Sequence, residues 1–144
     1  MKVERSIEIG ALPEKVWPLI SERDNIVRWH PNAERFDFVG EQHSGVGAVF
    51  YMVGNPGRQI MRSLCEITEW RENEKMTFRQ IMGMGQFESA YTIEATGTGS
   101  RLIIAWDYVL PFWVIGMVMG LLTRKMWVEM SDQMLRNIKG LAEA

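Results

Sequence analysis

The side chains that could carry out acid–base chemistry are few in this sequence. It holds two histidines, and His30 is the better candidate for proton transfer because an ordinary imidazole titrates at about pH 6.5. It lies between Trp29 and Pro31 in a predicted loop. His43 precedes a glycine turn, so we expect it at the surface of a hairpin. The single cysteine, Cys65, has apolar neighbours and is expected to be inert as a nucleophile.

Sequence motifs for nucleophilic, nucleotide or metal chemistry are missing. The sequence contains no Gly-x-Ser-x-Gly elbow and no phosphate-binding loop. The segment 45–50 begins like a dinucleotide-binding motif but has Phe50 where the last glycine belongs. Two histidines and one cysteine cannot supply a zinc site by themselves. We therefore expect no cofactor and no metal, and the sequence leaves open whether the protein is an enzyme.

The composition is typical of an ordinary globular domain. A chain of 144 residues with 47% hydrophobic residues can build one core, so residues 1–144 are predicted to form a single domain. The net charge of −2 argues against a nucleic-acid partner, because such proteins usually carry a basic excess. A single cysteine excludes an internal disulfide, and no secretory signal opens the sequence. We therefore expect a cytoplasmic location.

One apolar stretch, residues 109–122, could contact a membrane. Its uncharged part runs from Tyr108 to Thr123, which is shorter than the ~20 residues of a spanning helix, and it contains Pro111. We therefore expect no membrane span. Peripheral membrane contact stays open, and so does a homodimer that covers this stretch, because exposed apolar patches often mark interfaces.

Alternation of apolar and polar residues predicts strands through most of the chain. After a first strand near Val3, further strands are predicted over 34–39, 46–53, 58–70, 75–82, 86–95 and 101–110. Two short helices are also predicted, one from Pro13 that Pro18 should shorten or kink, and one over residues 22–28. Because the gaps between strands are short, neighbouring strands should pair antiparallel.

The C-terminal segment changes its period from two to about 3.6, which predicts a helix over residues 111–141. Its apolar stripe consists of Ile115, Met119, Leu122, Met126, Met130, Met134, Ile138 and Leu141. The sheet and this helix must each bury an apolar surface. We therefore predict an α+β fold in which a curved antiparallel sheet wraps around a long C-terminal helix.

This order of elements resembles that of the helix-grip superfamily, also called SRPBCC or START-like. That superfamily includes START lipid-transfer domains, plant pathogenesis-related proteins, and polyketide cyclases and dehydrases. Three local features agree with the resemblance: the segment 11–20, the loop Trp29-His30-Pro31, and the glycines at 40, 45 and 47. The resemblance covers essentially the whole chain. It implies a seven-stranded sheet, two short helices after the first strand, and a cavity between the sheet and the C-terminal helix that holds an apolar small molecule.

The candidate ligand site consists of side chains that should face this cavity. Strand alternation and the helix stripe supply most of them, and the loop before the second strand supplies two at the mouth. They are Phe78, Phe87, Tyr91, Trp106 and Tyr108 from strands, Met119, Leu122 and Met126 from the helix, and Trp29 and His30 at the mouth. The eleven methionines favour an adaptable apolar pocket. The alternative is that they fill gaps in a solid core.

Three charged strand residues have an ambiguous orientation. Arg62 and Glu66 share one strand face, whereas Cys65 and Ile67 share the other. We favour the exposed orientation for Arg62 and Glu66, because the other face suits an apolar wall better. Asp107 is likewise expected outside, but the sequence alone does not decide whether these charged groups face the cavity.

Two functions are compatible with these observations. The first is binding, with transport or sequestration, of a hydrophobic small molecule such as a lipid, an isoprenoid or an aromatic metabolite. The second is a polyketide cyclase/aromatase-like enzyme that uses a few polar cavity residues for acid–base chemistry. An enzyme of this kind needs at least two titratable groups that converge on one substrate position. The predicted inner faces offer few such groups, so binding is the leading hypothesis.

Overall fold

The computed structural model describes residues 1–31, 33–54, 61–83, 85–109 and 117–144, and of Met61 and residues 117–119 it describes the backbone alone. The elements are β1 (Lys2–Ile9), α1 (Pro13–Ser21), α2 (Arg23–Trp29), β2 (Ala33–Val39), β3 (Val49–Gly54), β4 (Met61–Arg71), β5 (Lys75–Met82), β6 (Gln86–Ala95), β7 (Ser100–Val109) and α3 (Met117–Glu143). The predicted start of the last helix, at residue 111, lies outside the described residues. The third strand begins at Val49 and not at residue 46.

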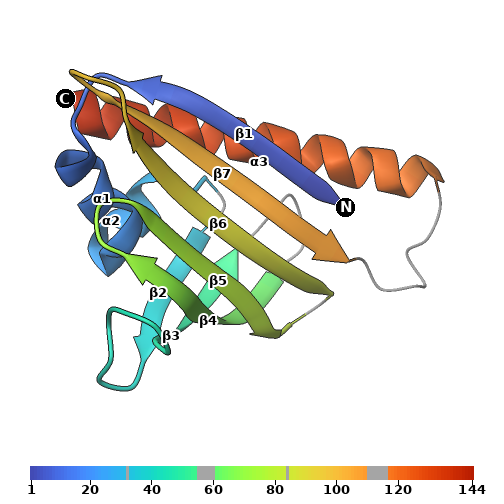
Figure 1. Cartoon of the computed structure of the whole chain (residues 1–144). Helices are drawn as coiled ribbons and strands as arrows, with labels where there is room; N and C mark the ends of the chain where they lie inside the picture. The colour runs from blue at the N-terminus through green and yellow to red at the C-terminus, as the bar shows by residue number, and fades with distance from the viewer. Residues whose placement is uncertain (32, 55–60, 84, 110–116) are drawn as a thin grey trace.

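The seven strands form one antiparallel sheet in the order β1-β7-β6-β5-β4-β3-β2. Strands β2 to β7 neighbour each other in chain order, as short connections require. Strand β1 joins the sheet by pairing with β7, where Val3 lies opposite Trp106. Figure 1 shows the sheet curving around the interior, with α3 along β1 and the two short helices at one end. The predicted helix-grip fold is confirmed.

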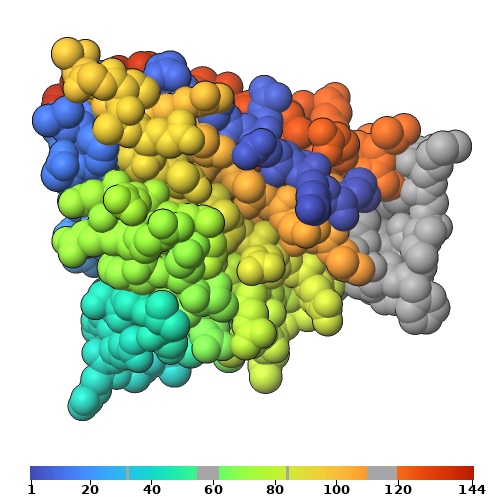
Figure 2. All heavy atoms as spheres, viewed as in Figure 1, coloured from blue at the N-terminus to red at the C-terminus, as the bar shows by residue number. Residues whose placement is uncertain are grey.

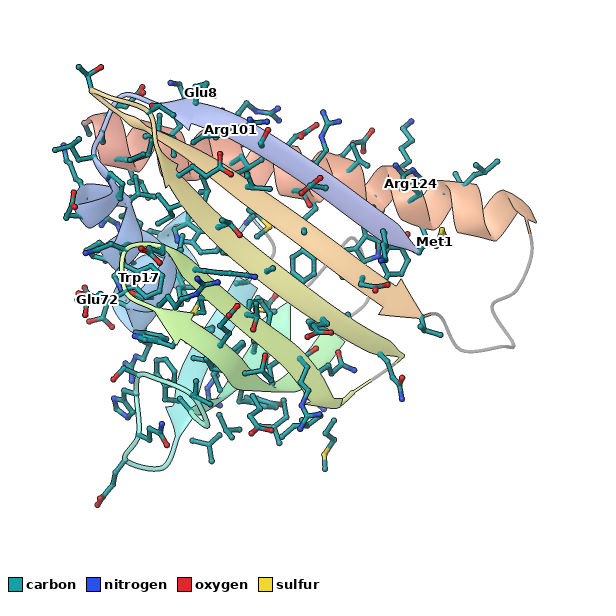
Figure 3. The ribbon with its side chains drawn as sticks, viewed as in Figure 1. Met1, Glu8, Trp17, Glu72, Arg101 and Arg124 are labelled. Atoms are coloured by element: carbon teal, nitrogen blue, oxygen red, sulfur yellow. The ribbon has the colours of Figure 1, made fainter. Side chains whose placement is uncertain are left out.

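The outer face of the sheet carries charged side chains that pair across strands. Figure 2 shows this face covered by side chains of β1 and β4 to β7. Arg101 on β7 lies 3.9 Å from Glu8 on β1, and Figure 3 shows the two on neighbouring strands. Arg79 on β5 lies 3.3 Å from Glu66 on β4. A charged outer face and an apolar inner face are typical of an antiparallel sheet with one solvated side.

The inner face follows the predicted alternation on β6 and β7. Its buried side chains are Ser89, Tyr91 and Ile93 on β6, and Leu102, Ile104, Trp106 and Tyr108 on β7. Helix α1 begins at Pro13, whose fixed backbone angle suits a first helical position, and it ends after nine residues with Pro18 inside it. Its buried residues Val16 and Ile20 face the same interior.

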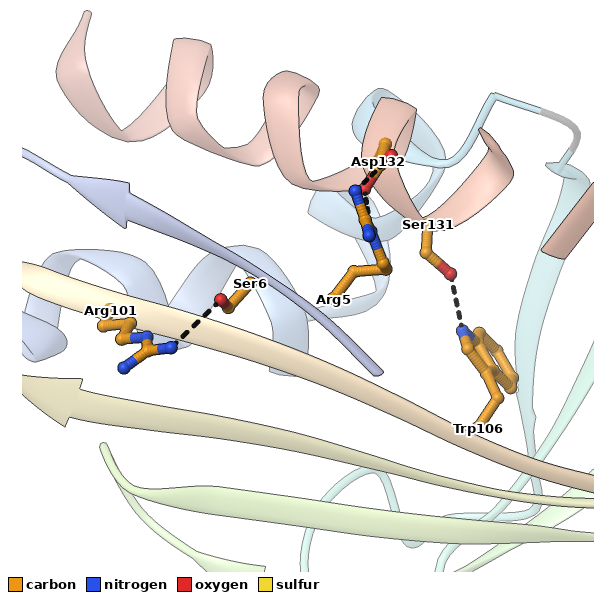
Figure 4. A network of polar contacts seen from close by, with 6 residues as sticks. All are labelled: Arg5, Ser6, Arg101, Trp106, Ser131 and Asp132. Carbon is orange, nitrogen blue, oxygen red and sulfur yellow. Dashed lines mark hydrogen bonds and ion pairs between the residues drawn. The ribbon is translucent and has the colours of Figure 1, made fainter. Parts of the chain in front are cut away.

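Polar contacts fix α3 against the sheet. Arg5 of β1 binds Asp132 with two hydrogen bonds, of 2.7 and 3.0 Å, and the indole nitrogen of Trp106 donates to the Ser131 hydroxyl at 3.0 Å (Figure 4). Near the start of the helix, Arg124 donates to the carbonyl of Lys2 at 2.6 Å. These contacts set the helix along β1, with one face toward β7.

The buried face of α3 differs from the predicted stripe in its first half. Met134 is fully buried, but Met126 is 41% exposed and Leu122 is 57% exposed. The reason is geometric, because each four-residue step turns about 40° past a full helical turn, and three such steps separate Leu122 from Met134. Trp127 is seven residues before Met134, almost two full turns, and it packs against the core instead.

Candidate functional site

A small apolar cavity lies in the interior of the sheet, next to the two short helices. Its volume is about 30 Å³. It is lined by Ile20, Ser21, Ile26, Trp29, His30, Phe36, Phe38, Phe50, Met52, Ile67, Met76, Phe78, Tyr91 and Trp106. A cavity of this size has room for one or two water molecules. Sites for drug-sized ligands are larger, roughly 300–1,000 Å³.

Aromatic rings fill most of the space around this cavity. Phe78 lies at the centre, with ring centroids 5.2 Å from Phe50, 5.6 Å from Tyr91 and 6.2 Å from Trp106. Phe36 stacks on Phe50 at 4.8 Å. Most of these rings meet edge to face or at a tilt, which is the favourable arrangement for aromatic pairs. Aromatic side chains therefore make up much of the cavity wall.

Five of the predicted site residues line the cavity: Trp29, His30, Phe78, Tyr91 and Trp106. Phe87 and Tyr108 belong to the same aromatic core but lie further along the sheet. There Phe87 packs 6.1 Å from Trp127, and Tyr108 stacks on Trp127 at 5.0 Å. These two residues are not among those that line the cavity.

Two of the three predicted helix residues do not line the cavity, and the third lies outside the described side chains. Leu122 and Met126 lie at the surface because the stripe rotates away from the sheet, so neither lines the cavity. The side chain of Met119 lies outside the described residues. The sheet end that holds the cavity therefore lies beside α1 and α2, away from the first turns of α3.

Strands β2 and β3 supply lining residues that the sequence prediction missed. Their register places Phe36 opposite Met52 and Phe38 opposite Phe50, so four apolar side chains meet on one face. The alternation of Phe36 and Phe38 is a signal that could have identified the first two. Met52 was harder to assign, because Tyr51 beside it is equally suited to an inner face.

Most polar groups in the cavity wall have partners. The indole nitrogen of Trp29 donates to the carbonyl of Leu19 at 2.6 Å, and the hydroxyl of Ser21 donates to the carbonyl of Trp17 at 2.8 Å. Tyr91 differs, because its hydroxyl forms no hydrogen bond with any residue that the structure describes. It is only 3% exposed, and its burial raises the pKa of its hydroxyl. Tyr91 is therefore a protonated, buried hydrogen-bonding group.

His30 is the second titratable group in the cavity wall. Its ring lies against Trp29, with centroids 5.9 Å apart, and the residue is partly buried. Burial of the imidazole lowers its pKa to about 4, since the charged form loses its hydration. His30 is therefore neutral at pH 7, where a neutral imidazole can accept a proton.

The stability of the protein should fall in mild acid because of His30. The unfolded chain binds a proton on this residue below about pH 6.5, whereas the folded protein does so only below about pH 4. Stability contributed by the neutral imidazole is therefore complete above pH 6.5 and is lost as the pH falls toward 4. We expect a loss of about 1–3 kcal/mol over this range, since the ring is partly accessible to solvent.

Urea unfolding at several pH values checks this prediction. His30→Phe should remove that part of the pH dependence, while His43→Phe serves as the matched control at the exposed histidine. An unchanged pH dependence in His30→Phe would show that His30 is accessible to protons in the folded protein.

The ambiguous charged residues lie outside the cavity. Arg62 and Asp107 are exposed, and Glu66 is partly buried in its pair with Arg79. The opposite face of β4 carries the buried residues Ser63, Cys65 and Ile67. Burial raises the pKa of the Cys65 thiol to about 12, so the thiol stays protonated and unreactive.

An open groove of about 830 Å³ lies beside the cavity. Trp17 of α1 and Glu72, after β4, border it, and Figure 3 shows both at this end of the molecule. On the other side, His43 lies against Phe38 with ring centroids 5.2 Å apart. Ser21 and Phe38 line both the groove and the cavity. Phe38 therefore separates the interior from an open surface.

The described part of the chain lacks two other kinds of site. No cluster there of three or more histidine, cysteine, aspartate or glutamate residues could hold a metal ion. Of the helices described, none has the length and apolar character needed to cross a membrane.

Comparison with known proteins places the chain in a family. A family model described as polyketide cyclase/dehydrase and lipid transport matches residues 1–143. Among curated protein sequences, none matches the chain.

Several solved structures share the fold. A protein from Thermus thermophilus has a TM-score of 0.86 and 20% identity, covering 99% of this chain and 97% of that one. A START superfamily protein from Mycobacterium smegmatis has a TM-score of 0.83 and 15% identity, covering 99% and 97%. The Zhui aromatase/cyclase from a Streptomyces species has a TM-score of 0.80 and 16% identity, covering 99% and 93%. At such identities the likeness concerns the fold. The family match over nearly the whole chain, together with the curved sheet and its long helix, shows that this protein belongs to the polyketide cyclase/dehydrase and lipid transport family.

Proposed function

We propose that the protein binds a hydrophobic small molecule in the cavity between the sheet and the helices. The observation that carries this proposal is the cavity wall, which is made almost entirely of aromatic and aliphatic side chains. Membership of the polyketide cyclase/dehydrase and lipid transport family supports this proposal. Moving the apolar surface of such a ligand out of water would favour binding by about 25 cal/mol for each Å² buried.

A ligand larger than two water molecules requires the cavity to open. Movement of Phe38 and Met52 would open the cavity, because both side chains are partly buried and Phe38 also borders the open groove. Methionine has three rotatable bonds and adapts readily to new neighbours. A ligand would therefore enter from the groove past Phe38. Displacing these side chains costs free energy, which lowers the observed affinity.

Ligand binding should appear as thermal stabilisation. A ligand at about 100 times its dissociation constant stabilises a folded protein by about 2.7 kcal/mol, or roughly 4–10 °C for a chain of this length. We expect at least one class among isoprenoids, fatty acids and aromatic polyketides to produce such a shift in a melting experiment.

Two methionine variants locate the site. Met52→Glu places a charge in the cavity wall and should abolish the shift, because burying it beside an apolar ligand is costly. Met126→Glu makes the same chemical change on the exposed surface of α3 and should preserve the shift. Absence of stabilisation by every class, or equal loss in both variants, would contradict binding at this cavity.

A second candidate function is an enzyme of the cyclase/aromatase kind. One observation favours it: His30 and Tyr91 both line the cavity, so a neutral base and a hydroxyl donor face the same space. In that case His30→Ala should stop the conversion of a bound polyketide, followed by mass spectrometry as loss of water, while leaving its thermal shift in place. Loss of binding and conversion together would assign His30 to binding.

A further inference from the structure

The unpaired hydroxyl of Tyr91 indicates which chemical group a ligand should carry. Tyr91 lies in the middle of β6, opposite Met76 on one side and Ile104 on the other. Its ring contacts Trp29, Phe78 and Trp106, with centroids 6.2, 5.6 and 6.4 Å away. These neighbours hold the ring in place and offer no hydrogen-bond partner to its hydroxyl, nor does any other described residue.

A buried hydroxyl without a partner is unusual and costly. Most buried polar groups in proteins are hydrogen-bonded, and leaving one unpaired loses the interaction it had with water. The other polar groups in the wall illustrate the rule, since the nitrogens of Trp29 and Trp106 and the hydroxyl of Ser21 all have acceptors in the protein. The hydroxyl of Tyr91 is therefore available to form a hydrogen bond with a ligand in the cavity.

The charge of the ligand can be inferred from the same wall. Among the described residues that line the cavity, none is a lysine, arginine, aspartate or glutamate. The imidazole of His30 is neutral at pH 7 for the reason given above. A carboxylate in this cavity would therefore find no lysine or arginine to pair with in the described part of its wall, and an unpaired buried charge is strongly unfavourable.

We propose that the cavity selects a neutral, largely apolar molecule with one oxygen acceptor, such as a ketone, and that Tyr91 donates the hydrogen bond that orients it. This inference rests on the proposed binding function and narrows it. It favours neutral carbonyl compounds as ligands over free fatty acids. Tyr91 then acts as a specificity-determining residue, because a hydrocarbon of the same shape would leave its hydroxyl unpaired.

Three probes on one ring system test the proposal by calorimetric titration: naphthalene, 2-acetylnaphthalene and 2-naphthoate. In the unmodified protein the ketone should bind and the carboxylate should not bind measurably. In Tyr91→Phe, the preference for the ketone over naphthalene should fall by about fivefold to tenfold, the factor expected for one hydrogen bond. Naphthalene itself should bind Tyr91→Phe at least as well as it binds the unmodified protein.

Tyr108→Phe is the matched control. It removes the hydroxyl of another buried tyrosine, one that contacts the sulfur of Met1 at 3.6 Å and lies outside the cavity. The ratio of ketone to naphthalene affinity should not change in this variant. Without ligand, Tyr91→Phe should melt about 2–5 °C higher than the unmodified protein, because a buried hydroxyl with no partner in the protein is gone, whereas Tyr108→Phe should show no such gain.

The outcomes separate this inference from the function on which it rests. A ketone preference that survives in Tyr91→Phe, or a carboxylate that binds as tightly as the ketone, overturns the inference while binding at the cavity stands. Failure of every probe to bind the unmodified protein overturns the inference and the proposed function together. Loss of the preference in Tyr91→Phe but not in Tyr108→Phe supports both.

Discussion

Replacing Phe78 by alanine should lower the free energy of unfolding by about 3–5 kcal/mol and create a cavity that binds benzene. Phe78 is buried at the centre of the ring cluster, in contact with Phe50, Tyr91 and Trp106. Truncating it removes these contacts and joins the space of its ring to the existing cavity. A largely apolar cavity enlarged in this way can accept small aromatic molecules.

Urea unfolding with and without benzene measures both effects. Phe87→Ala is the matched control, since this partly buried ring packs against Phe78 but does not line the cavity. The Phe87→Ala variant should lose less stability than Phe78→Ala, and benzene should stabilise it less. If Phe78→Ala is destabilised but gains nothing from benzene, the surrounding rings must collapse into the gap, and the interior would behave as a solid core.

Replacing Trp106 by alanine should also cost about 3–5 kcal/mol, and it should loosen α3 from the sheet. The indole ring contacts Trp127 of α3 at 4.7 Å, and its nitrogen donates to Ser131 of the same helix. The variant therefore removes one of the buried links between β7 and α3, together with part of the cavity wall, and leaves the stacking of Tyr108 on Trp127. Amide hydrogen exchange should show a larger loss of protection in residues 127–138 than in β4 and β5.

Trp106→Phe separates packing from the hydrogen bond. It keeps an aromatic ring but leaves the fully buried Ser131 hydroxyl without this partner, so about 1–3 kcal/mol should be lost. Unchanged protection of α3 in Trp106→Ala would mean that its remaining contacts, such as Arg5 with Asp132 and Tyr108 with Trp127, are enough to hold the helix on the sheet.

The fold could be predicted from sequence because its signals are local. Alternation identified the buried faces of β6 and β7, and the change of period identified the C-terminal helix. The error in α3 arose because a four-residue spacing was followed across too many turns, which assigned Met126 to the interior in place of Trp127. Only the position of the helix against β1 reveals which face is buried.

The cavity itself could be predicted only in part. Trp29 and His30 were placed at its mouth from the resemblance, and Phe78, Tyr91 and Trp106 from alternation. The contributions of Phe36, Phe38 and Met52 depend on how β2 and β3 pair, which no single segment specifies. Its volume of about 30 Å³ depends on how many rings meet in three dimensions, and the unpaired hydroxyl of Tyr91 is likewise a result of packing.

A crystal structure of the protein with 2-acetylnaphthalene tests the proposed binding in the interior most directly. We expect the naphthalene ring to lie between Phe38, Phe78 and Trp29, with the side chains of Phe38 and Met52 displaced from the positions described above. The ketone oxygen should lie within hydrogen-bonding distance of the Tyr91 hydroxyl, about 2.5–3.0 Å. A ligand found in the outer groove or on the surface, with the ring cluster unchanged, would contradict the claim that this interior opens to bind an apolar molecule.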